Sequence, residues 1–70
     1  MIEIFKTNVQ LQRDALLIVT NLEKKLSNTK INFDMEDCDK ILRIEGTSKS
    51  KNKFIISYLH QLGYNCEILE

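Results

Sequence analysis

The spacing of apolar residues changes along this chain in a fixed order, and that order limits what the chain can fold into. Residues 2–6, 31–35 and 41–44 are short and rich in β-prone side chains, and the first two alternate as half-buried strands do. A first stretch with apolar residues every three or four positions follows residues 2–6, as on one face of a helix. The residues of that stripe are Leu11, Ala15, Ile18, Leu22 and Leu26. A second such stretch at 54–62 precedes a last short strand at 65–69. The predicted order is strand, helix, strand, strand, helix, strand.

Polar residues mark the ends of the two predicted helices. Thr7 or Asn8 is expected to cap the first helix, because their side chains accept hydrogen bonds from free backbone N–H groups. Ser48 or Ser50 has the same position before the second helix. Gly63 is placed to end that helix, since a left-handed residue at a helix C-terminus costs glycine little.

These elements predict a ferredoxin-like fold. Each helix has one apolar face, so both helices must cover the same side of a four-stranded sheet. The result is an α+β, βαββαβ two-layer sandwich with an antiparallel sheet in the order 4-1-3-2. We expect one such domain over residues 1–70, because 70 residues suffice for one small core.

Three connections share one end of this predicted fold, which we call the upper end. They are the loop at 7–10, the turn at 36–40 and the turn at 63–65. If the domain binds something small, we expect the site at this end. The candidate residues are Thr7, Asn8, Cys38 and Tyr64.

Charge and composition exclude several classes of function. Ten basic and ten acidic residues give a formal net charge of zero, which argues against nucleic acid as a partner. The longest apolar run, residues 15–19, is far shorter than a membrane-spanning helix, so we expect no membrane span. Two cysteines are too few for a disulfide-stapled secreted domain. We therefore expect a cytoplasmic protein with reduced thiols.

The loop after the first strand makes the chain resemble the heavy-metal-associated domains, the family of copper chaperones and of N-terminal domains of metal-pumping ATPases. In that family the first strand ends in Met-Thr-Cys-x-x-Cys. Here Thr7 matches the threonine, while Asn8 and Leu11 stand where the two metal thiolates would be. The alternating strand at 31–35 is also similar to the family's second strand.

A second point of resemblance is the pair Gly63-Tyr64. It is similar to the Gly-Tyr pair before the last strand of bacterial copper chaperones, where the tyrosine lies against the metal loop. The resemblance implies the fold and a loop-supporting role for Tyr64. It does not imply metal binding, because Cu(I) requires thiolates and neither Asn8 nor Leu11 supplies one. We expect no cofactor.

The two cysteines leave one alternative open. Cys38 lies in an acidic turn and Cys66 opens the last strand, so both are expected near the upper end. A divergent copper or zinc carrier could use Cys38, with Cys66 as a second thiolate. The plainer interpretation is that Cys66 alternates with Ile68 and is a small core residue, as free cysteines often are.

The uncovered face of the sheet is a candidate interaction face. We assign Phe5 and Ile41 to it, as a cross-strand pair on neighbouring strands, with Arg43 and Leu69 extending it. A cluster of apolar side chains on an open sheet is typical of a docking surface. A protein partner or a second copy of the chain is the expected occupant.

Catalysis has no support in the residue pattern. The chain has a single histidine and no spacing typical of a nucleophile with its base. We therefore predict a non-enzymatic binding or interaction module that docks through the upper loops or the open sheet face.

Overall fold

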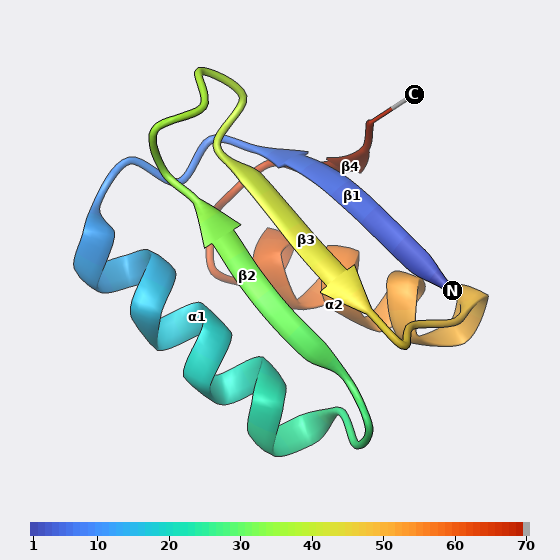
Figure 1. The fold of residues 1–70 in the computed structure, drawn as a ribbon. Coiled ribbons are helices and arrows are strands. Elements are labelled where there is room, and N and C mark those ends of the chain that lie inside the picture. The colour runs from blue at the N-terminus through green and yellow to red at the C-terminus, as the bar shows by residue number, and fades with distance from the viewer. Residues whose placement is uncertain (70) are drawn as a thin grey trace.

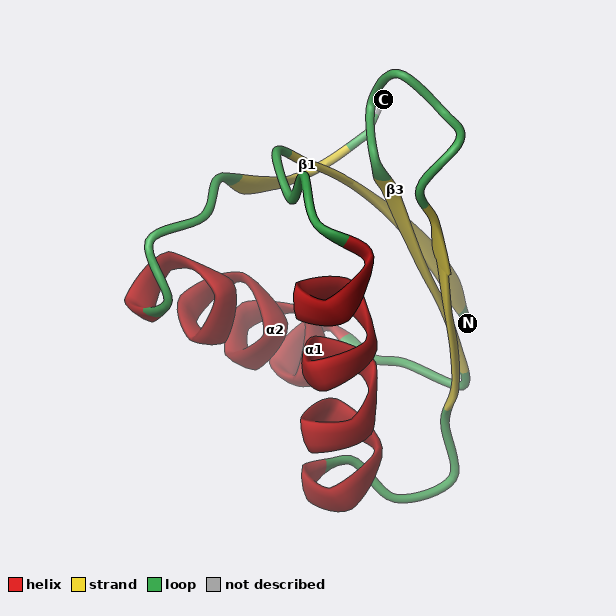
Figure 2. Ribbon diagram, turned by 90° about the vertical axis from the view of Figure 1, so that its left-hand side faces the viewer, coloured by secondary structure: helices red, strands yellow, loops and turns green. Residues whose placement is uncertain are grey.

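The predicted order of elements and the predicted sheet are both confirmed. A computed structural model describes residues 1–69 of the chain. The elements are β1 (Ile2–Thr7), α1 (Gln12–Lys25), β2 (Lys30–Asp34), β3 (Ile41–Glu45), α2 (Lys49–Gln61) and β4 (Cys66–Ile68). The sheet order is β2-β3-β1-β4, which is 4-1-3-2 counted from the other edge, and every pair is antiparallel. Both helices lie on the same side of this sheet (Figures 1 and 2).

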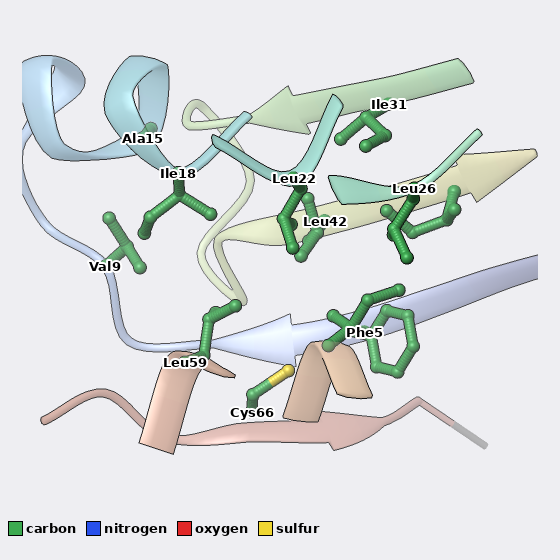
Figure 3. Packing of buried hydrophobic residues seen from close by; sticks show 12 residues of the cluster. Phe5, Val9, Ala15, Ile18, Leu22, Leu26, Ile31, Leu42, Leu59 and Cys66 are labelled. Carbon is green, nitrogen blue, oxygen red and sulfur yellow. The ribbon is translucent and has the colours of Figure 1, made fainter. Parts of the chain in front are cut away.

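The core lies between the helices and the covered face of the sheet (Figure 3). Four members of the predicted stripe on α1 are buried there, and they are Ala15, Ile18, Leu22 and Leu26. The fifth, Leu11, is exposed. Leu11 is the N-cap residue of α1 and has an extended backbone, so it stands outside the helical face that its spacing suggested.

The predicted cap of α1 is wrong, whereas that of α2 is confirmed. No side chain caps α1, because the chain continues in a loop beyond Thr7 and Asn8 before the helix begins at Gln12. In α2, the Ser48 side chain accepts a hydrogen bond from the Lys51 N–H at 3.2 Å.

The assignment of Phe5 to the open face is also wrong. Phe5 is fully buried and pairs with Leu42, another fully buried residue, so both side chains point toward the helices. Because strand residues alternate between faces, Ile2 and Ile4 then occupy the open face. Ile41 lies next to Leu42 on β3 and faces the open side as predicted. Strand β1 carries apolar residues on both faces, and the bulkier Phe5 is the one that fills the core.

Within residues 1–69, neither helix has the length and apolar character that crossing a bilayer would require.

Candidate functional site: the upper loops and the exposed apolar surfaces

The structure brings the predicted upper loops together, and Thr7 is the residue that joins two of them. The Thr7 N–H donates to the Asp39 carbonyl at 3.0 Å, and its Oγ1 donates to the Lys40 carbonyl at 2.6 Å. The Val9 N–H in turn donates to Thr7 Oγ1 at 3.4 Å. Thr7 is buried, so these bonds replace water around its hydroxyl. Its hydroxyl therefore fixes the turn after β2 against the loop after β1.

Asn8 joins the third connection to the same loop. Its Oδ1 accepts a hydrogen bond from the Asn65 N–H at 2.8 Å. The two residues are 57 positions apart in sequence, and the bond ties the loop after β1 to the turn before β4. Where the resembling family carries its first metal thiolate, this chain therefore carries a link between two loops.

Tyr64 makes its hydrogen bond to helix α1. Its hydroxyl donates to Asp14 Oδ2 at 2.9 Å, and Asp14 lies in the first turn of α1. The Asp14 carboxylate, through that bond, raises the pKa of Tyr64 above its ordinary value, because ionising the phenol would lose the donated proton. Tyr64 thus holds the start of α1 beside the last turn.

Three of the predicted residues at the upper end, Thr7, Asn8 and Tyr64, thus have hydrogen-bond partners within the chain. A groove of about 470 Å³ lies at this end, and its lining residues are Lys6, Thr7, Asn8, His60, Asn65, Cys66 and Glu67. The Thr7 hydroxyl and the Asn8 carbonyl in its wall already have partners. Among residues 1–69, every buried side-chain nitrogen and oxygen has a hydrogen-bond partner. The predicted binding end therefore uses the Thr7 hydroxyl and Asn8 Oδ1 to hold its loops together.

The two cysteines lie in different environments. Cys38 is exposed, and its sulfur and the carboxylates of Asp37 and Asp39 lie within 4.8 Å of one another. In the part of the chain that the structure describes, this is the one group of three close potential metal ligands, and Cys66 is not in it. Cys66 is buried, and that burial raises the pKa of its thiol to about 12. The raised pKa makes the metal-binding thiolate form of Cys66 harder to reach.

The open face of the sheet carries a group of exposed apolar side chains. Ile2 is 53% exposed, Ile4 37% and Leu69 42%. The half-buried Ile41 is on the same face, two residues along β3 from Arg43, which stands opposite Ile4. The Leu69 N–H donates to the Ile4 carbonyl at 2.9 Å, which sets these two residues side by side on adjoining strands. We call Ile2, Ile4, Ile41 and Leu69 the open-face patch. The alternation in β1 gives two faces, and the structure places Ile2 and Ile4 on the open one.

Charges of both signs surround the open-face patch. Arg43 stands opposite Ile4 on β3 and forms an exposed ion pair with Glu45 at 3.6 Å. Lys6 stands opposite Glu67 on β4. The predicted position of Arg43 on this face agrees with the register. Because neither sign dominates, the face does not select a strongly charged partner.

A second apolar surface, which the sequence did not suggest, lies between α1 and β2. It is a groove of about 430 Å³ lined mainly by Ala15, Leu16, Val19, Ile31, Phe33 and Met35, with Gln12, Arg13 and Asn32 at its rim. Leu16 is 68% exposed and lies off the apolar stripe of α1. That exposed leucine next to an alternating strand was the only sign of the groove in the sequence.

No protein-family model, curated protein or solved structure matches this chain. The heavy-metal-associated family therefore remains a resemblance, carried by Thr7 and by the pair Gly63-Tyr64. The chemistry of the surfaces described above must support any functional assignment.

Proposed function

We propose that this domain is a non-enzymatic interaction module that docks a protein partner on its open-face patch. The observation that carries the proposal is the exposure of Ile2, Ile4 and Leu69 on a sheet face that no helix covers. An antiparallel sheet with one face in water normally places polar residues there. Three neighbouring aliphatic side chains on that face depart from this pattern.

Burial of the patch would supply the driving force for docking. Removing apolar surface from water contributes about 25 cal/mol per Å². The surrounding ion pair of Arg43 with Glu45 gives the patch a polar rim, as is common in protein interfaces. The mixed charge favours a partner with a similarly balanced surface, which includes a second copy of this chain.

The upper end supports binding less well than the sheet face. The side chains of Thr7, Asn8 and Tyr64 hold the loops to one another and to α1. The alternative of a soft-metal carrier has weaker support still. Burial raises the pKa of the Cys66 thiol, and the close potential ligands beside Cys38 are carboxylates rather than thiolates. Two free thiols support a reducing compartment such as the cytoplasm.

Site-specific photo-crosslinking in cells tests the proposal. A photoreactive amino acid is placed at Ile2 in the patch and, as the control, at the exposed Glu23 on α1. We expect a discrete crosslinked species from position 2, absent from position 23 and abolished by Ile4→Lys. Identical products from both positions would refute the assignment. Crosslinks between two copies of the chain would identify the partner as the domain itself.

A further inference from the structure

The groove between α1 and β2 adjoins a strand edge that pairs with no other strand of residues 1–69. In the sheet order β2-β3-β1-β4, strand β2 pairs with β3 on one side and is the edge on the other. Figure 1 shows α1 running alongside β2 at that edge. Unpaired backbone groups at a sheet edge are a template for another extended chain.

Hydrogen bonds between the strands show which backbone groups of the inner strands face which neighbour. The Leu69 N–H donates to the Ile4 carbonyl, so the backbone groups of Ile4 face β4. In antiparallel sheets this direction alternates along a strand, so those of Phe5 face β3 and its paired residue Leu42. The Thr7 N–H, which donates to the Asp39 carbonyl, shows the same alternation.

The same alternation extends to β2. Because the backbone groups of Leu42 face β1, those of the next residue, Arg43, face β2, where Arg43 pairs with Asn32. The N–H and C=O groups of Ile31 and Phe33 therefore point to the free edge. The side chains of these two residues line the groove, so one short segment offers both backbone partners and an apolar wall.

We propose that this edge binds an extended segment of a partner protein as an additional strand, antiparallel to β2 and beneath α1. The backbone of Ile31 and Phe33 would pair with the segment, and alternate apolar side chains of the segment would enter the groove against Leu16. Strand addition of this kind gains affinity from the backbone and specificity from pockets for alternate side chains. The proposal does not depend on the open-face patch.

The charged residues of β2 indicate which types of residue the partner segment should carry at each position. The residues that alternate with the groove-lining ones are Lys30, Asn32 and Asp34, all exposed. An antiparallel segment places its first residue opposite Asp34 and its last opposite Lys30. Opposite charges across strands stabilise the pairing, whereas like charges destabilise it. The partner segment is therefore basic, apolar, polar, apolar and acidic, in that order.

A second copy of this chain is the competing occupant. Strand β2 itself, with the sequence KINFD, satisfies the same pattern. However, α1 runs alongside β2 (Figure 1), so a two-fold pairing of two β2 strands would bring the α1 helices of both copies toward each other on the same side of the joined sheet. A single extended segment brings no second helix.

Nuclear magnetic resonance titration with a capped peptide, Ser-Arg-Val-Thr-Val-Glu-Ser, tests this proposal. We expect amide shifts at Ile31, Phe33 and neighbouring residues of α1. The control peptide exchanges the Arg and the Glu and should bind more weakly. The variant Leu16→Glu should weaken binding about tenfold or more, because it places a charge in the groove. The matched control is Leu17→Glu, which changes a residue that is 60% exposed but outside the groove.

Several outcomes would overturn the proposal. The absence of shifts at millimolar peptide, or equal weakening by Leu16→Glu and Leu17→Glu, would exclude the groove. Equal binding of both peptides would exclude the charge pattern. Shifts in β2 that grow with protein concentration alone would identify a second copy as the occupant instead. The variant Ile4→Lys should leave peptide binding unchanged, so this proposal and the open-face proposal can fail separately.

Discussion

The upper loops and the open face of the sheet use their side chains in opposite ways. At the upper end, Thr7, Asn8 and Tyr64 direct their polar atoms at one another's loops or at α1. On the open face, Ile2 and Ile4 direct aliphatic groups into water. The first region uses polar side chains to hold loops together, and the second leaves apolar side chains exposed.

This difference has a physical cause. The connections at the upper end come from distant parts of the chain, and the side-chain hydrogen bonds of Thr7 and Asn8 hold them to one another. A buried hydroxyl such as that of Thr7 must also have a partner, because leaving it unpaired costs free energy. The helices already provide the core on the other side of the sheet, so folding does not require burial of Ile2 or Ile4.

The largest expected effect concerns Cys66, which pairs with Thr7 beneath the upper loops. Its pKa is raised from 9.0 to about 12 by burial. The unfolded thiol ionises near pH 9 while the folded one stays protonated, so the unfolded state binds fewer protons. The stabilisation is complete below pH 9 and is lost as pH rises toward about 12. We expect the free energy of unfolding to fall by up to about 1.4 kcal/mol per pH unit there, measured by urea unfolding.

Two variants isolate this contribution. Cys66→Ala removes the ionising group and should flatten the pH dependence, apart from the part due to Tyr64, whose pKa is also raised. Cys38→Ser is the matched variant at an exposed cysteine. If the free energy of unfolding of Cys66→Ala depended on pH as it does in the unchanged protein, the Cys66 thiol would ionise in the folded state as readily as in the unfolded state. The two cysteines would then not differ as their burial implies.

A smaller effect than the total loss on ionising Cys66 between pH 9 and about 12 is expected at Thr7 itself. Thr7→Val keeps the shape of the side chain but removes the hydroxyl that donates to the Lys40 carbonyl. We expect a loss of about 2 kcal/mol in the free energy of unfolding, because a buried hydrogen-bond partner is left unpaired. Thr20→Val is the control, since its hydroxyl bonds to the Leu16 carbonyl on the exposed side of α1. Equal losses in the two variants, measured by urea unfolding, would contradict a special role for the upper loops.

The sequence predicts the fold because apolar spacing is a local property. The stripe from Ala15 to Leu26 and the alternation of Ile31 with Phe33 each define an element and its covered face. The face of β1 could not be assigned in this way. Ile4 and Phe5 are both apolar, so alternation gives two faces but does not say which one the helices cover.

The site was less predictable because it depends on residues far apart in sequence. The bond between Asn8 and Asn65 appears only when two turns meet at one end of the sandwich. The groove likewise requires Leu16 and Phe33, from separate elements, to lie side by side. Sequence pattern located the loops correctly but did not show that Thr7, Asn8 and Tyr64 link them to one another and to α1.

The smallest effect on stability is expected on the open face, and it completes the contrast with Thr7. Ile2→Thr keeps a β-branched side chain on β1 while removing apolar surface from the patch. Because Ile2 is 53% exposed, we expect the free energy of unfolding to change by no more than about 0.5 kcal/mol. Urea unfolding at several protein concentrations measures this change. A loss comparable with that of Thr7→Val would mean that the face is buried in the folded protein by self-association, and the loss should then diminish on dilution.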